Sequence, residues 1–349
     1  MRGLPFGGNR LRHRQRRVAV DRAECRFLYS SSPRVGARSH AVADTLSVSV
    51  ILPTHNRPRL LAEAVGSVLA QQRQPEQLIV VDDSSTGEPA RVLEGLGRPC
   101  TAGVTVIRGP GRGPGAARNA GLRAAQCDLV AFLDDDDLWH PRKLELQLPA
   151  FERAPSLGVL GTTAAGGPGL PQTGSAQAGA SRGGRLRAVA LGSLVRANRL
   201  VMSSVVARRA CLEGCGGFDE SLALAQDWDL WLRAARNWQV AALTVPLVCY
   251  RRHSGQRSAD AAAMRWWEGE VLRRALARGL PGRRLEGIAR RRLAWSHLRL
   301  GRLLSGVGEA ELAREQFREA TALCRWSPLA WLGLVRCGLA ARAPARARP

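Results

Sequence analysis

Residues 48–83 read VSVILPTHNRPRLLAEAVGSVLAQQRQPEQLIVVDD, and this stretch decides the fold. It opens with the apolar run 48–52 and closes with a second apolar run, 78–81. Between them, leucine, valine and alanine recur at three- and four-residue spacing from Leu60 to Leu69, which is typical of an amphipathic helix. Strand, helix and strand in this order predict a βαβ unit, in which the two strands lie parallel and the crossover is right-handed.

Two more apolar runs extend the pattern along the chain. Residues 104–107 and 129–133 predict a third and a fourth strand. A Gly/Pro-rich loop over 109–115 leads into a predicted helix over 116–125. The sequence therefore predicts an α/β domain whose sheet is mainly parallel and is flanked by helices.

Polar clusters follow three of the four predicted strands. They are residues 54–56, the pair Asp82-Asp83, and the run 134–137. In a doubly wound sheet, ligands bind beyond the carboxyl ends of the strands. We therefore expect these clusters to converge on one cleft.

The densest cluster is a run of four aspartates, Asp134 to Asp137, directly after the apolar residues 129–133. Adjacent like charges repel, and carboxylates normally stay in water. A helix N-terminus with solvated acids accounts for one or two of these residues, but not for four. Hard divalent cations take oxygen ligands, and Mg²⁺ is commonly shared between carboxylates and substrate phosphates, so the run predicts a metal–phosphate site.

Composition narrows the class of partner. The 349 residues carry a net charge of +23 and have a pI of about 11.4, which favours anionic partners such as nucleotides, acidic lipids and phosphorylated carriers. Of the 52 basic residues only Lys143 is lysine, and the abundance of Ala, Gly and Arg indicates a mutational bias in codon usage. Because the chain has only two Tyr and six Phe and no recognisable nucleic-acid-binding motif, we predict no specific nucleic-acid binding.

Localisation and redox state are predicted from apolar runs and cysteines. The sequence holds no run of about 18 apolar residues and no apolar core of signal-peptide type near its start. We expect a cytoplasmic protein whose basic residues favour peripheral contact with the inner face of the plasma membrane. The eight cysteines are scattered, and the single close pair Cys211 and Cys215 does not complete a zinc site, so reduced thiols are predicted.

Three segments differ from the α/β pattern. Residues 1–45 are rich in arginine and lack periodicity, which predicts a disordered basic arm. Residues 161–187 are rich in Gly, Ala and Ser and predict a long flexible loop. Over 259–349 the period is helical, and the spacing of small and apolar residues between 300 and 328 weakly resembles one tetratricopeptide helix pair.

Five segments, in order and in spacing, resemble glycosyltransferase family 2, a family with the GT-A fold. They are residues 48–57, 79–86, 115–121, 130–139, and 217–220 followed by 226–233. The resemblance covers residues 46–258 and implies a Rossmann-like, mixed, mainly parallel sheet. It also implies a nucleotide-binding half over 46–140 and an acceptor half over 188–258. The implied reaction is inverting, metal-dependent transfer of a sugar from a nucleotide-diphosphate donor to a glycan or lipid-linked acceptor.

The resemblance assigns the aspartate run to an Asp-x-Asp element that holds Mn²⁺ or Mg²⁺ on the donor diphosphate. Asp136 is the favoured direct ligand, Asp134 contacts metal or nucleotide, and Asp135 contacts the substrate. His253 follows a further predicted strand over residues 245–250 and is implied to complete the metal shell, although a histidine of a surface loop is the alternative.

Further residues are implied to bind the donor. Asp83, with Asp82 beside it, matches the carboxylate that recognises the nucleotide base and ribose, whereas a simple Asx-turn is the alternative. The base-stacking loop corresponds to Pro53, Thr54 and His55. The side chains implied to contact phosphate are those of Arg112, Arg118 and Arg251.

Asp227 is the candidate catalytic base. Inversion needs a carboxylate on the side opposite the leaving diphosphate, to take the proton of the acceptor hydroxyl. The family usually has Glu-Asp here, whereas this chain has Gln226-Asp227, which leaves the acceptor class open. Asp229 is the second candidate, and a helix N-cap is the structural alternative for Asp227.

Two other functions remain open. A nucleotidyltransferase of related fold generally places a Gly-rich phosphate loop after the first strand, whereas this chain has Pro-Thr-His-Asn-Arg-Pro there, which argues against that function. A catalytically inert protein that binds nucleotide sugars and recruits partners through its helical tail is the other alternative.

Overall fold

The computed structural model describes residues 46–84, 88–95, 103–165, 184–251, 256 and 259–340, so the predicted arm over 1–45 lies outside the described residues. Within these residues a single sheet runs in the order β3-β2-β1-β4-β8-β6-β9-β5, and β7 pairs with β9. The strands are β1 Val48–Thr54, β2 Gln77–Asp82, β3 Gly103–Arg108, β4 Leu129–Phe132, β5 Asp137–Trp139, β6 Leu157–Ala165, β7 Leu186–Ala188, β8 Val206–Arg208 and β9 Gln239–Tyr250.

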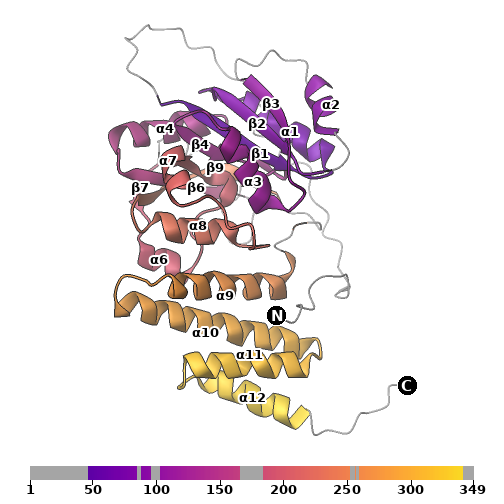
Figure 1. Cartoon of the computed structure of the whole chain (residues 1–349), viewed down its shortest axis with the longest axis vertical. Helices are drawn as coiled ribbons and strands as arrows, with labels where there is room; N and C mark the ends of the chain where they lie inside the picture. The colour runs from indigo at the N-terminus through magenta and orange to yellow at the C-terminus, as the bar shows by residue number, and fades with distance from the viewer. Residues whose placement is uncertain are drawn as a thin grey trace, which may run out of the picture.

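Helices surround the sheet and then form a tail below it (Figure 1). Those of the sheet region are α1 Pro58–Leu69, α2 Glu88–Gly95, α3 Pro114–Ala124, α4 Lys143–Arg153, α6 Leu191–Arg196, α7 Arg209–Gly214 and α8 Gln226–Ala234, with the short 3₁₀ helix η2 at Met202–Ser204. Those of the tail are α9 Ala261–Ala277, α10 Arg283–Gly306, α11 Ala310–Leu323 and α12 Pro328–Ala340.

The predicted βαβ unit and the α/β fold are confirmed. Strand β1 lies between β2 and β4 and is parallel to both. In this register Thr54 pairs with Asp82, and Ile51 pairs with Phe132, so the carboxyl ends of three strands meet at one edge. The sheet is mixed, because β8, β5 and β7 each pair antiparallel with a neighbour.

Strand β1 is buried on both faces, and its alternate residues enter two different hydrophobic clusters. Val50 and Leu52 pack in the cluster that α1 and α4 cover. Ile51 packs in the cluster that α3, α8 and α9 cover. A continuous apolar strand is thus sandwiched between two helical layers, which is the arrangement expected for the parallel part of an α/β sheet.

Lys143, the only lysine of the chain, is fully buried at the start of α4. Its ammonium group lies 4.1 Å from the centroid of the Trp139 ring. Within the described residues Nζ has no hydrogen-bond partner. Burial lowers the pKa of this side chain well below its ordinary value.

The prediction of a long loop over 161–187 is wrong at both ends of this range, where the structure has strands. Residues 161–165 are part of β6, and β7 begins at Leu186. Small residues fit here because neighbours approach closely: a Cβ at Gly161 would lie 2.6 Å from Leu200 Cδ2. The glycine at 161 therefore reflects tight packing of β6, whereas β7 is exposed, and residues 166–183 lie outside the described part of the chain.

The helical tail has two cores. Val271 and Leu272 of α9 and Leu293 of α10 belong to the same cluster as the helices of the sheet region. The second half of α10 packs instead with α11 and α12, around Phe317. Glycines permit this approach, since a Cβ at Gly301 would lie 2.8 Å from the Phe317 ring. The tail is therefore continuous with the sheet region at α9 and builds a core of its own beyond it.

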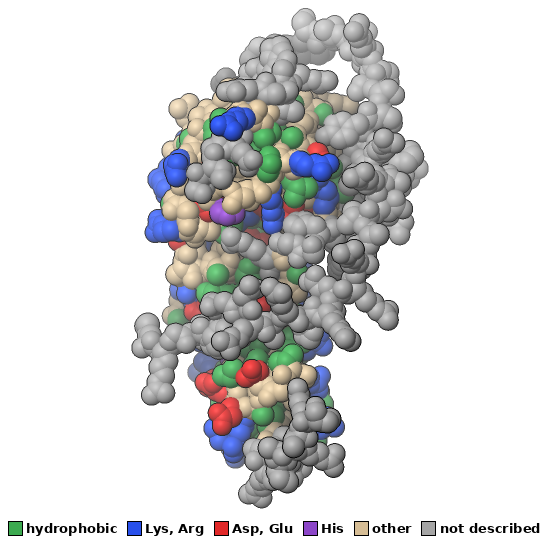
Figure 2. Space-filling view, turned by 90° about the vertical axis from the view of Figure 1, so that its right-hand side faces the viewer, with side chains coloured by type: hydrophobic (Ala, Val, Ile, Leu, Met, Phe, Trp, Pro, Cys, Tyr) green, Lys and Arg blue, Asp and Glu red, His purple; other side chains and the backbone are tan. Residues whose placement is uncertain are grey.

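On the visible part of the face shown in Figure 2, basic side chains are spread over the sheet region and the tail. They stand beside acidic side chains on the tail and form no single continuous patch there. Among the described helices, none combines the length and the apolar character that crossing a membrane requires.

Candidate active site

The carboxyl ends of β1, β2 and β4 open onto a cleft with a volume of about 740 Å³. Thr54, Asp83 and Asp134, one residue from each predicted polar cluster, line it. Residues 198–202, residues 223–228 and helices α3 and α9 also contribute to the lining. The cleft lies where ligands bind in open α/β sheets.

Asp135 and Asp136 share one cation in the turn after β4. Arg57 Nη1 lies 3.1 Å from a carboxylate oxygen of each. Asp135 is buried and also accepts a hydrogen bond from Thr54 Oγ1 at 2.9 Å. Burial raises the pKa of Asp135, while Thr54 and Arg57 act to lower it. This carboxylate therefore fixes the turn against the end of β1.

Ser203 joins the first and last aspartates of the run. Its Oγ accepts the backbone N–H of Asp134 at 3.1 Å and donates to the Asp137 carboxylate. Asp134 also forms an ion pair with Arg118, and Asp137 accepts the backbone N–H of Arg251 at 3.2 Å. Asp137 is fully buried, and burial, followed by the charges of the other carboxylates, raises its pKa well above the ordinary value.

Three of these carboxylates are close enough to hold a metal ion together. Ligand oxygens of Asp134, Asp136 and Asp137 all lie within 4.8 Å of one another. An all-carboxylate donor set suits a hard divalent cation such as Mg²⁺ or Mn²⁺. The residues present therefore fit the predicted ion, with Asp137 beside the predicted pair, whereas His253 lies outside the described residues.

Asp83 organises the Gly/Pro-rich loop over 109–115. Its carboxylate accepts the backbone N–H groups of Gly111 at 2.7 Å and Gly113 at 3.1 Å. His55 Nδ1 lies 2.9 Å from the Asp83 carbonyl oxygen. Pro53, His55 and Asp83 line the cleft. The Asp82 carboxylate is bonded to Ser84 and lies behind the lining.

The three predicted phosphate-binding arginines differ in position. Arg118 lines the cleft beside Asp134. Arg112 is 68% exposed in its side chain and pairs with Glu220 at 2.9 Å, away from the lining. Arg251 donates hydrogen bonds to the backbone carbonyl groups of Asp135 and Asp136, so it stabilises the aspartate turn. The structure thus brings Arg118, but neither of the other two, to the cleft surface.

Asp227 lies in the first turn of α8 and lines the cleft. Its carboxylate accepts hydrogen bonds from Asn198 Nδ2 and from the Trp228 backbone N–H, both at 2.8 Å. Burial raises its pKa, and these two hydrogen bonds partly offset the rise. Ala225, directly before the helix, has the left-handed φ of 59°, a strained conformation that is most common at functional sites.

The second candidate base lies elsewhere. Asp229 is fully buried and is held by Arg233 Nε at 2.9 Å and Arg278 Nη1 at 2.6 Å. It does not line the cleft.

Sequence reasoning missed three residues that the geometry brings to the site: Arg57, Asn198 and Ser203. Arg57 had a usable signal, because it follows the first strand within the predicted polar turn. Asn198 and Ser203 had none, because each meets its aspartate across a large sequence separation.

Residues 49–203 match the family described as glycosyl transferase family 2. The part of this chain that carries the aspartate run is therefore a glycosyltransferase domain of family 2. Among curated proteins, the succinoglycan biosynthesis protein ExoW of Rhizobium meliloti is 42% identical over 100 residues, or 28% of this chain and 31% of that protein. The chain spans about a third of the length of the first curated relatives that it matches.

Solved structures extend the likeness beyond that domain. TarS of S. aureus in complex with UDP-GlcNAc matches with a TM-score of 0.61 at 20% identity, over 84% of this chain and 89% of that one. The mannosyltransferase PcManGT of Pyrobaculum calidifontis, in complex with GDP-Man and Mn²⁺, matches with a TM-score of 0.56 at 22% identity, over 86% and 81%. At these identities the likeness shows the fold, which is the GT-A fold.

Proposed function

We propose that this protein is an inverting, metal-dependent glycosyltransferase, which moves one sugar from a nucleotide-diphosphate donor to a hydroxyl group of a glycan or lipid-linked acceptor. The observation that supports this most is one cleft lined both by the aspartate turn and by a separate carboxylate, Asp227. A metal-binding carboxylate cluster and an isolated base are the two functions that such a transfer needs.

In the proposed reaction Asp227 accepts the proton of the acceptor hydroxyl as that oxygen attacks the anomeric carbon. Asn198 orients the carboxylate and keeps one oxygen occupied by a hydrogen bond. The raised pKa makes Asp227 a stronger base than an exposed aspartate. The neighbouring Gln226 is uncharged and donates to the Ala223 carbonyl oxygen at 3.1 Å, so it supports the loop before α8.

The donor half of the cleft is suited to a nucleoside diphosphate. Asp134, Asp136 and Asp137 would hold Mn²⁺ or Mg²⁺, whose positive charge would stabilise the leaving diphosphate. Arg118 adds a guanidinium group at the same end of the cleft. His55 and Asp83 lie at the carboxyl ends of β1 and β2, where we assign the base and ribose.

Three similar proteins support the substrate classes. TarS binds UDP-GlcNAc and PcManGT binds GDP-Man, which supports a nucleotide-sugar donor. ExoW acts in succinoglycan biosynthesis, which supports a surface glycan or its lipid-linked precursor as acceptor.

Titration calorimetry tests the donor site. UDP and GDP are titrated into the protein with and without MnCl₂, and we expect binding of at least one nucleotide to require Mn²⁺. Nucleotide binding that is equally tight without MnCl₂, or no nucleotide binding at all, contradicts the proposal.

Turnover tests the base. Across a panel of nucleotide sugars, we expect Asp227→Asn to lower transfer by about 10²–10⁴-fold, the usual contribution of a general base. The Kd for the nucleotide should stay unchanged, because Asp227 is assigned to the acceptor side. Full activity in this variant would refute the assignment.

A further inference from the structure

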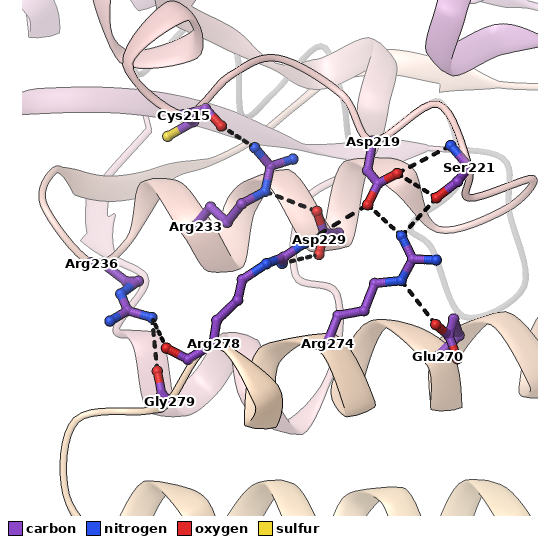
Figure 3. A network of polar contacts seen from close by, with 10 residues as sticks. All are labelled: Cys215, Asp219, Ser221, Asp229, Arg233, Arg236, Glu270, Arg274, Arg278 and Gly279. Carbon is purple, nitrogen blue, oxygen red and sulfur yellow. Dashed lines mark hydrogen bonds and ion pairs between the residues drawn. The ribbon is translucent and has the colours of Figure 1, made fainter.

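Helix α9 lies outside the family 2 segment, yet ion pairs fix it to the acceptor half of the cleft (Figure 3). Arg274 forms an ion pair with Asp219, in the loop before α8. Arg278, at the C-terminal end of α9, binds the fully buried Asp229 of α8 at 2.6 Å. These ion pairs hold the C-terminal half of α9 in a defined position relative to α8, the helix that carries Asp227.

Two side chains of α9 reach into the cleft. Met264 and Glu268 are one turn apart on the helix, and both are part of the cleft lining. The lining also includes residues 198–202 and Trp228, the residue next to Asp227. Arg292 binds Glu268 and lies 5.7 Å from the Trp228 ring centroid, which places Glu268 near the base.

The carboxylate of Glu268 is held through one of its two oxygens. Arg265 Nη1 at 2.6 Å and Arg292 Nη2 at 2.9 Å both bind Oε2. Within the described residues Oε1 has no partner, and the side chain is 16% exposed. Arg292 is itself anchored, because its Nε donates to the Arg196 carbonyl oxygen at 2.8 Å and its guanidinium lies 5.7 Å from the Trp228 ring centroid.

We propose that α9 forms a wall of the acceptor site and that Glu268 Oε1 accepts a hydrogen bond from a hydroxyl group of a sugar ring of the acceptor. This inference rests on the proposed glycosyl transfer, which requires the acceptor to lie beside Asp227. A fixed carboxylate oxygen is a pure acceptor and matches a sugar hydroxyl. A deprotonated phosphate oxygen has no proton to donate, so the group that binds at this oxygen is a hydroxyl. The half-buried Met264 provides apolar surface of the kind that ligand sites combine with a few polar groups.

Saturation-transfer NMR tests the wall. Methyl glycosides of glucose, galactose and N-acetylglucosamine serve as probes, with the donor site filled by UDP and Mn²⁺. In Glu268→Gln the amide oxygen stays with the two guanidinium groups, so an N–H donor replaces Oε1. We expect binding of the preferred glycoside to weaken about tenfold or more, the cost of losing a hydrogen bond to a charged group.

Glu270→Gln is the matched control. Glu270 is also a glutamate of α9 paired with two arginines, Arg273 and Arg274, but it does not line the cleft. This variant should bind the glycoside as the wild type does, and Met264→Ala should weaken binding. In transfer assays Glu268→Gln should raise the acceptor KM and leave kcat and the donor KM nearly unchanged.

The outcomes separate this inference from the proposed function. If no transfer occurs but glycoside binding still depends on Glu268, the glycosyltransferase assignment fails and the acceptor wall stands. If Glu268→Gln binds every probe as the wild type does, or if Glu270→Gln loses binding equally, the wall is refuted while metal-dependent nucleotide binding is unaffected.

Discussion

At the scale of the residue, Asn198 sets the proton affinity of Asp227. Its N–H stabilises the ionised carboxylate and so lowers a pKa that burial raises. A base is active only when deprotonated, so activity is lost as the pH falls through its pKa. We expect Asn198→Ala to raise this pKa and to shift the acid limb of the kcat/KM profile to higher pH.

The measurement is a pH profile of transfer for both proteins, with the alkaline plateau as the internal control. The plateau should be retained, because Asp227 is ionised there in either protein. An acid limb that stays in place or moves to lower pH would contradict the role assigned to Asn198.

The role of a single residue was predictable where its neighbours in sequence already indicate the chemistry. Four adjacent aspartates after a buried strand indicate a cation site on charge alone, and Asp134 and Asp136 do lie together with Asp137. Arg251 shows the limit: its charge suggested a phosphate contact, but its guanidinium is committed to the backbone carbonyl groups of the aspartate turn. The sequence shows that a charged side chain is present, but it does not show which group that side chain binds in the folded protein.

At the scale of the element, α3 depends on a residue without a side chain. A Cβ at Gly121 would lie 2.5 Å from Ile51 Cγ2 and 3.2 Å from Val81 Cγ2, in the core beneath β1 and β2. We expect Gly121→Ala to lower the free energy of unfolding by about 1–3 kcal/mol, as overpacked cores do. Because α3 also carries Arg118, the Kd for UDP and Mn²⁺ should rise as well.

Urea denaturation measures the loss. Gly214→Ala is the control, because that helical glycine of α7 has nothing within 4 Å of an added Cβ. It should leave the unfolding midpoint unchanged or raise it. Equal midpoints for the two variants would mean that α3 moves to accommodate the methyl group.

The elements of the βαβ region were predictable because each strand is a continuous apolar run and the helix between them shows helical spacing. Strand β5 was not. Its three residues are buried, and its pairing with β9 joins Asp137 to Tyr250, far apart in sequence. A short strand that forms only through a distant partner has no local pattern to detect.

At the scale of the whole molecule, α9 is attached through a buried charge. Asp229 is fully buried between Arg233 and Arg278, and the latter is 35% exposed. Removing Arg278 leaves the carboxylate with one partner. We expect Arg278→Ala to cost about 1–3 kcal/mol of folding stability, the penalty for an under-satisfied buried acceptor.

Chemical denaturation with Arg283→Ala as the control tests this attachment, since Arg283 is exposed at the start of α10. The control should unfold at the wild-type denaturant concentration. If both variants match the wild type, Asp229 finds enough compensation in Arg233 alone.

Helical periodicity predicted the tail but not how it divides. The sequence shows one amphipathic pattern after another, whereas α9 completes the core of the sheet region and α11 and α12 pack around Phe317. The division depends on which apolar face meets which partner, and that is decided by the position of the whole sheet region rather than by any window of residues.

Because Lys143 is buried, we expect the folded protein to resist cleavage by a lysine-specific endoprotease. The chain offers such an enzyme one cleavage point, between Lys143 and Leu144, and the folded protein hides both side chains. Cutting requires the start of α4, directly after the aspartate turn, to open. We expect the fragments 1–143 and 144–349 to appear slowly, and more slowly still with UDP and Mn²⁺. The rate of this single cleavage therefore reports how often the segment beside the metal site opens.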